Sequence, residues 1–450
     1  MMTPGRTAAL IITLAVLAIL AAGSWLAFDS SSPSISRESR VEAPGAAASS
    51  SPANADALID FWKERVDRNP ADYISYAELG GAFIRRARET GDVESYTRAE
   101  AAIQESLRLN PDYSTALGYL ATIDYSRHDF QSALAIAQRI KLADPTDLQA
   151  IAVLGDANLE LGNYDEAGAA YELLREKSES APVLARLARL AELRGATDEA
   201  SSLLAAAVLD ADTEGASTES RAWYRSQLGH VYLRSGNVDA ARKQFEDAMR
   251  TFPGYIHGLA GLAAVNAALG NYNEAIDLYS EVSSRYPVPE YAGLFGDVLA
   301  ADGQADRAHQ QYQLVLTIDE LYRSNGIDTD LQIALFRADH ALDTAEAVRQ
   351  ARAEYAVRPS IYAADTLAWA LYNTSNYDEA LEFSQEALRL GTRDPLLLFH
   401  AGMIHQSVGN SREARQYLSD ALDINPGFSV LHAGDARETL DRLEAAVAGE

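Results

Sequence analysis

The stretch 256–289 carries two runs of apolar residues with helical spacing. In the first run, Leu259 and Ala263 are four residues apart, which places them on one face of a helix. Gly270 then interrupts the pattern, and a second run with the same spacing stops at Pro287. Neither run is long enough to bury its apolar face alone. The pattern therefore predicts a pair of short helices that packs against further copies of itself.

Copies of this pair continue through most of the chain. The phrase Tyr-Asp-Glu-Ala begins at Tyr164 and again at Tyr377, and a related Tyr-Asn-Glu-Ala begins at Tyr272. Pro111 and Pro145 are 34 residues apart. In period and phrasing the unit resembles the tetratricopeptide repeat, a helix–turn–helix of 34 residues. Ten candidate units begin near residues 73, 114, 148, 181, 222, 256, 289, 328, 361 and 395.

The resemblance implies an all-α fold, a superhelical helix–turn–helix solenoid. We expect the repeat array to occupy residues 55–428, and its half-unit Ala57–Pro70 to precede the first full unit. A helix within 429–450 should cap the stack, because the terminal units of a solenoid need a polar outer face. Small residues such as Ala263 and Ala275 are expected where the two helices of a unit cross.

Three units depart from the pattern. About seven extra residues near Ala87–Val93 should lengthen the turn of the first unit. The segment Asp210–Ser220, with its glycine, serines and threonines, is predicted to be an inserted loop. The unit near Asp328 has Leu335 where a small residue is expected and has no glycine in its turn, so the stack should loosen near Leu321–Gly326.

Residues Thr7–Phe28 contain no charged side chain. As a helix this run is roughly 33 Å long, enough to cross a hydrocarbon core of about 30 Å. Ala21-Ala22-Gly23 offers a signal-peptide cleavage site, but the apolar run continues through Trp25. We predict an uncleaved membrane anchor in residues 1–28, and a cleaved signal peptide remains the alternative.

Residues 29–54 are rich in serine, alanine and proline and lack helical periodicity, which is typical of a flexible linker. Under the positive-inside rule, Arg6 before the apolar run favours a cytoplasmic amino terminus, whereas Arg37 and Arg40 after the run favour the opposite orientation. Because so short a leader is more naturally retained in the cytoplasm, we expect a single-pass protein with an extracytoplasmic repeat domain, periplasmic or at the cell surface. The alanine-rich repeat phrases look like bacterial members of the family, which favours a bacterial envelope.

The chain has a formal net charge of −27 and no cysteine. A nucleic-acid partner is not expected, since binding phosphates requires clustered lysine and arginine. Absence of cysteine excludes disulfides and thiol chemistry. No cofactor, metal site or catalytic residue is predicted: the histidines are scattered, and no HExxH motif or phosphate-binding glycine loop occurs. We therefore do not expect an enzyme.

In the family that this chain resembles, the first helices of the units line a concave groove. Chaperone-binding members hold a peptide carboxylate there with lysine and asparagine, but the early groove positions here are small or mixed, so that function is not carried over. Toward the C-terminus the groove positions become aromatic. The predicted partner-binding residues are Phe336, Asp365, Trp369, Tyr372, Phe399 and Met403. The alternative is that these side chains cover neighbouring helices.

These observations predict a non-catalytic, membrane-tethered scaffold that binds a protein or peptide in its groove. Two alternatives remain open from the sequence. One is a structural assembly factor that self-associates, and the other is an accessory subunit of an envelope enzyme complex.

Overall fold

The computed structural model describes residues 53–448 except 91 and 93, and every regular element in that range is an α-helix. In chain order the helices are α1 (Ala53–Arg68), α2 (Tyr73–Thr90), α3 (Glu94–Leu109), α4 (Ser114–Ser126), α5 (Phe130–Ala143), α6 (Leu148–Glu160), α7 (Tyr164–Lys177), α8 (Ala181–Leu193), α9 (Thr197–Thr213), α10 (Thr218–Arg234), α11 (Val238–Thr251), α12 (Ile256–Ala268), α13 (Tyr272–Arg285), α14 (Pro289–Ala301), α15 (Ala305–Ser324), α16 (Asp330–Asp339), α17 (Thr344–Val357), α18 (Ile361–Asn373), α19 (Tyr377–Ala387), α20 (Pro395–Ser407), α21 (Ser411–Ile424) and α22 (Ala433–Ala448).

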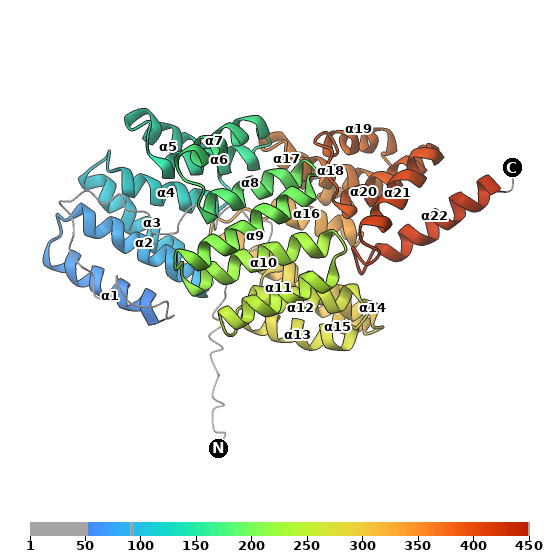
Figure 1. The fold of residues 1–450 in the computed structure, drawn as a ribbon, viewed down its shortest axis with the longest axis horizontal. Coiled ribbons are helices and arrows are strands. Elements are labelled where there is room, and N and C mark those ends of the chain that lie inside the picture. The colour runs from blue at the N-terminus through green and yellow to red at the C-terminus, as the bar shows by residue number, and fades with distance from the viewer. Residues whose placement is uncertain (1–52, 91, 93, 449–450) are drawn as a thin grey trace, which may run out of the picture.

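Helices α2 to α21 pair in chain order as helical hairpins, and each hairpin packs on the next (Figure 1). Helix α1 precedes the first hairpin, and α22 projects from the far end of the array. The first helices of most hairpins begin at the residue that the repeat pattern predicts, for example at Ser114, Leu148 and Pro395. The predicted all-α superhelical solenoid is therefore confirmed for the residues that the structure describes.

The hairpin α12–α13 shows how one unit holds together. Leu259, Ala263, Ala275, Tyr279 and Val282 are all buried, with exposed fractions of 5% or less. Ala263 and Ala275 share one apolar cluster and are both fully buried. A larger side chain at either position would push the two helices apart, because a packed interior has no spare volume.

Two predicted irregularities take a different form in the structure. The extra residues near Ala87–Val93 extend α2 as far as Thr90, so they lengthen a helix more than a turn. The loop predicted over Asp210–Ser220 is wrong for most of its length, since only residues 214–217 lie between α9 and α10. The reason is burial: Ala211 and Ala222 lie in the apolar cluster of these two helices, and this packing favours continued helix.

The hairpin α16–α17 makes its turn without glycine. Ala341 (φ 49°) and Asp343 (φ 42°) adopt left-handed backbone conformations there, which cost an L-residue about 1–2 kcal/mol each. The side chain of Asp343 accepts a hydrogen bond from the N–H of Glu346 and so caps α17. Helix α16 still contacts α18, which keeps this unit in the stack.

The array winds back on itself, so that units far apart in the chain touch. The N–H of Ile361 donates to the hydroxyl of Tyr164 over 2.9 Å, although the two residues are 197 positions apart. Asn425 Nδ2 donates to the carbonyl of Leu233 over 2.8 Å, across 192 positions. In both pairs a residue near the turn of an early hairpin meets the connection before or after a later helix.

The same contact recurs nearer the start of the array. The N–H of Asp328 donates to the carbonyl of Arg127 over 3.2 Å. Gln131 Nε2 donates to the carbonyl of Val357 over 3.2 Å, across 226 positions. We call this series of contacts the winding seam, and it joins the turns of the early hairpins to the loops of the late ones.

The backbones approach so closely at the winding seam that side chains are excluded. A Cβ atom at Gly195 would lie 2.2 Å from the carbonyl oxygen of Gly391, and one at Gly236 would lie 2.2 Å from that of Ile424. By contrast, among the described residues nothing lies within 4 Å of a Cβ built at Gly270, which occupies the equivalent turn of α12–α13.

The predicted anchor Thr7–Phe28 lies outside the described residues, as does the predicted linker 29–54 apart from its last two positions, where α1 begins. Among the helices of the described ranges, none has both the length and the apolar character needed to cross a membrane.

Candidate functional site

Three successive first helices, α16, α18 and α20, lie side by side near the C-terminal end of the array. The stacking of units brings equivalent positions of the three helices together, and the connection that leads into α22 joins them. Aromatic and histidine side chains from these four places form one cluster, which we call the C-terminal cluster. Its central members are Asp339, Asp365, Trp369, Phe399, His400 and His432.

Trp369 lies at the centre of the C-terminal cluster and is 5% exposed. Its ring stacks between those of Tyr372 and His400, with centroids 4.6 and 4.2 Å away. Its indole Nε1 donates to Asp339 Oδ1 over 2.9 Å, which satisfies the one polar atom that burial would otherwise isolate. The indole therefore joins α16, α18 and α20.

His400 is fully buried, and its two ring nitrogens have different surroundings. Nδ1 lies 2.9 Å from Asp365 Oδ2 and is hydrogen bonded to it. Nε2 has no hydrogen-bond partner among the described residues. Burial disfavours the charged imidazolium, but the neighbouring carboxylates, Asp365 foremost and then Asp339 and Asp394, together raise the pKa of His400 above its usual value.

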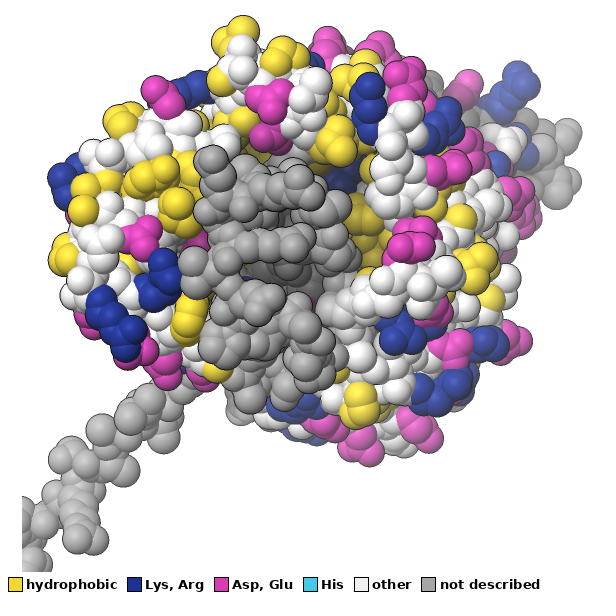
Figure 2. Space-filling view, turned by 60° about the vertical axis from the view of Figure 1, so that its left-hand side comes forward, with side chains coloured by type: hydrophobic (Ala, Val, Ile, Leu, Met, Phe, Trp, Pro, Cys, Tyr) yellow, Lys and Arg dark blue, Asp and Glu magenta, His cyan; other side chains and the backbone are white. Residues whose placement is uncertain are grey.

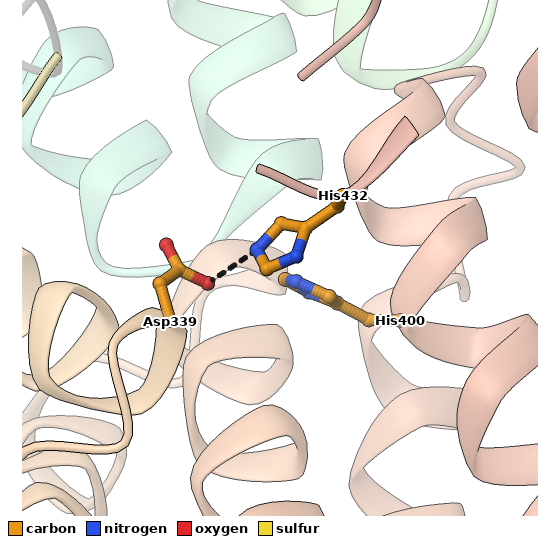
Figure 3. A group of neighbouring side chains, drawn as sticks. All are labelled: Asp339, His400 and His432. Atoms are coloured by element: carbon orange, nitrogen blue, oxygen red, sulfur yellow. Dashed lines mark hydrogen bonds and ion pairs between the residues drawn. The ribbon is translucent and has the colours of Figure 1, made fainter. Parts of the chain in front are cut away.

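His432 reaches the C-terminal cluster from the turn immediately before α22. Its Nε2 lies 3.1 Å from Asp339 Oδ1, and its ring stacks on Phe399 with the centroids 4.9 Å apart. Figure 3 shows both histidine rings directed toward the Asp339 carboxylate. Asp339 ends α16, and its side chain is 16% exposed.

The structure divides the six residues predicted to bind a partner. Asp365, Trp369 and Phe399 are buried in the C-terminal cluster, with exposed fractions of 5% or less. Tyr372 and Met403 pack against it and are half-buried. The packing of the three buried side chains against neighbouring helices is the alternative that the sequence left open. A partner-binding role for the six stays a prediction.

Phe336 lies apart from the other five. It packs against the rings of Tyr312 and His340 and belongs to an apolar cluster shared with α2 to α4. Phe336 and Trp369 hold the same repeat position in successive units, yet the two side chains have different neighbours. Phe336 and Trp369 therefore do not form one continuous surface.

Sequence reasoning did not group Asp339, His400 and His432. These residues come from two different units and from the connection that follows the last unit. Placing the repeats in register would have set Asp339 and His400 on helices of the same stack. No register predicts where His432 lies, because it follows the last repeat.

The fold defines a helical-hairpin repeat protein, and comparison with known families agrees with it. Tetratricopeptide repeat models match residues 84–147, 125–182, 232–298, 361–393 and 396–428. The chain belongs to the tetratricopeptide repeat family.

A curated relative is tetratricopeptide repeat protein 37 of Xenopus laevis, which is 28% identical over 236 residues. The match covers 51% of this chain but only 14% of that protein. Among solved structures, yeast Tom70 is 14% identical, with a TM-score of 0.35 over 88% of this chain and 93% of that one. A tetratricopeptide repeat protein from Parabacteroides merdae is 15% identical, with a TM-score of 0.42 over 59% and 93% of the two chains.

Proposed function

We propose that this chain is a membrane-tethered, non-catalytic scaffold that binds a protein or peptide in the concave groove of its repeat array. The observation that supports this proposal best is the gathering of aromatic side chains where α16, α18 and α20 lie side by side. Tyr372 and Met403 are half-buried at that place, so they retain surface for a partner. Trp369, beneath them, holds the three helices in place.

The partner class follows from the surface charge. On the face shown in Figure 2, lysine and arginine side chains are interspersed with aspartate and glutamate around the wall of the molecule. A nucleic-acid site needs a continuous basic surface. A protein or peptide partner fits this mixed surface better, because aromatic side chains provide most of the binding energy at protein interfaces.

The tether proposal rests on the uncharged run Thr7–Phe28. It places one membrane-spanning helix before the array, with the array outside the cytoplasm. The full chain should sediment with membranes and resist carbonate extraction, whereas a version that begins at Ala53, where α1 starts, should stay in the supernatant. Recovery of native protein with its amino terminus near Ser24 would support a cleaved signal peptide instead.

The groove proposal is tested by affinity capture of partners in detergent, followed by mass spectrometry. The double variant Tyr372→Ala/Met403→Ala removes apolar surface from the groove, and Leu142→Ala, whose side chain is 85% exposed on α5, removes it elsewhere. We expect the groove variant to lose a protein that the Leu142 variant retains. Equal capture by both variants would contradict the proposed site.

The two alternatives predict different results in the same preparation. Self-association would appear as a multiple of the chain mass in light scattering, independent of any captured protein. An accessory role would appear as an enzyme that co-purifies in a fixed ratio.

A further inference from the structure

Asp339, His400 and His432 bring one carboxylate and two imidazoles to a single point. One ligand atom from each residue lies within 4.8 Å of the other two. The three residues come from the end of α16, from α20 and from the turn before α22 (Figure 3). Two histidines and one carboxylate form a common ligand set for divalent transition metals in proteins.

The second observation is the unpaired nitrogen of His400. Because Asp365 occupies Nδ1, Nε2 is the ring nitrogen of His400 that remains for a further partner. Nε2 is buried and has no hydrogen-bond partner in the described part of the chain. Burial without a hydrogen-bond partner is energetically unfavourable for such an atom. A bound cation would remove that cost, and a carboxylate on the opposite nitrogen is how metal-binding histidines are usually oriented.

A histidine–aspartate pair elsewhere in the chain shows the structural alternative. His340 is also paired with an aspartate, with Nε2 2.8 Å from Asp297 Oδ1. Its Nδ1 is hydrogen bonded to the carbonyl of Phe336 at 2.7 Å. Both of its nitrogens are therefore satisfied. His400 differs in having one nitrogen unpaired beside a second histidine and a second carboxylate.

We propose that Asp339, His400 and His432 form a binding site for a divalent transition cation of the zinc class. In tetrahedral zinc sites with bonds of about 2.1 Å, ligand atoms lie roughly 3.4 Å apart. His432 Nε2 and Asp339 Oδ1 are already 3.1 Å apart. The third ligand atom lies within 4.8 Å of these two. Three protein ligands leave one coordination position for water or a partner's side chain.

The surrounding residues support the ligands. Asp365 fixes the ring of His400, and the Trp369 indole donates to Asp339. A cation at this point would join α16 and α20 to the turn that leads into α22. It should therefore stabilise the C-terminal end of the array, because a ligand that binds only the folded chain adds its binding free energy to the free energy of unfolding.

The test uses the full chain in detergent, purified without a histidine tag and stripped of metal with a chelator. Isothermal titration with zinc chloride should show one saturable site per chain. Asp339→Asn and His432→Gln should each weaken the affinity by about 100-fold or more, while Asp365→Asn, which changes a positioning residue, should weaken it by about 10–100-fold. Cobalt(II) in the same site should give the visible absorption bands of a tetrahedral complex.

Two controls separate this site from general attraction to an acidic protein. Asp378→Asn removes one exposed carboxylate on α19, and His340→Gln removes the fully paired histidine. Both should bind zinc as the unmodified chain does. Zinc should also raise the melting temperature of the unmodified chain and of these controls, but not that of Asp339→Asn.

Three results would overturn the proposal. The first is no saturable zinc binding by the unmodified chain. The second is equal affinity in Asp339→Asn, His432→Gln and the two controls. The third is a zinc-induced rise in melting temperature that survives in Asp339→Asn. Circular dichroism of each variant excludes loss of fold as the cause of lost binding, and His432→Gln keeps the test valid if Asp339→Asn is unstable.

Discussion

The glycines in the turns of hairpins α8–α9 and α12–α13 have the same backbone φ angle but different surroundings. Gly195 and Gly270 both have φ of +74°. The carbonyl of Gly391, from a remote unit, lies directly against Gly195, whereas no described atom lies within 4 Å of a Cβ at Gly270. Glycine is required at both turns by the local conformation, and at Gly195 the winding of the array adds a second requirement. Stacking is thus encoded in every repeat, while winding depends on particular positions.

The largest expected effect comes from changing these two glycines to alanine. Gly270→Ala should cost about 1–2 kcal/mol, which is the price of a left-handed conformation for an L-residue. Gly195→Ala should lower the free energy of unfolding by a further ~1–3 kcal/mol, because its Cβ would overlap the backbone of Gly391, which cannot rotate away as a side chain can. Urea unfolding measures both losses. Equal losses would contradict the close approach at the winding seam.

The next effect uses pH to weaken the hairpin α12–α13. His257, on α12, is 8% exposed, and burial lowers its pKa to about 4. Below pH 6.5 the unfolded chain takes up a proton that the folded chain does not, so the free energy of unfolding should fall between pH 6.5 and 4. The loss from this residue is up to about 3 kcal/mol.

Unfolding measured across this pH range should give a shallower slope for His257→Gln than for the unmodified chain. Hydrogen exchange at pH 5 should also rise in α12 of the unmodified chain more than in His257→Gln. An unchanged slope in the variant would show that His257 does not titrate in this way.

A smaller effect is expected for Asn425→Ala. Asn425 is 3% exposed, and its amide bridges the carbonyl of Leu233 and the N–H of Gly427. Removing the amide leaves buried backbone groups unpaired and should cost about 2 kcal/mol. Asn271 is the control, because its amide makes one exposed contact within its own unit, to Asn266. Thermal unfolding should separate the two variants, and equal melting temperatures would argue against the bridge.

The smallest effect compares two tyrosines that begin the same repeated phrase. The hydroxyl of Tyr164 accepts a hydrogen bond from the buried N–H of Ile361, whereas that of Tyr377 contacts the exposed Ser375 nearby. Tyr164→Phe should cost about 1 kcal/mol and Tyr377→Phe almost nothing. Hydrogen exchange at the amide of Ile361 reports the contact directly. Unchanged protection of the Ile361 amide in Tyr164→Phe would contradict a hydrogen bond between these two residues.

The helices were predictable because each unit's information is local. The spacing of Leu259 and Ala263 and the breaks at Gly270 and Pro287 lie within one unit, and they place both helices. Prediction failed over Asp210–Ser220, where polar and small residues suggested a loop. Ala211 is buried in an apolar cluster with Ala222, and this packing extends the two helices through the segment.

The winding seam and the C-terminal cluster were not predictable in the same way. Tyr164 and Tyr377 belong to nearly identical phrases, so the sequence holds no sign that only the first meets a remote unit. Groove positions were assigned from the repeat register, which correctly set Trp369 near Phe399. The register does not tell whether a neighbouring helix or solvent covers a side chain, and here the indole is covered.

The most direct measurement of the winding is a cross-link across the seam. The chain has no cysteine, so cysteines placed at Gln131 and Val357 would be its only thiols. The side chain of Gln131 reaches the carbonyl of Val357, and Val357 is 53% exposed. The control pair is Gln131 with Leu269, which is 49% exposed beside the open turn at Gly270. A short bifunctional maleimide should link residues 131 and 357 within one chain in high yield and the control pair hardly at all; equal, low yields from both pairs would contradict an array that winds back on itself.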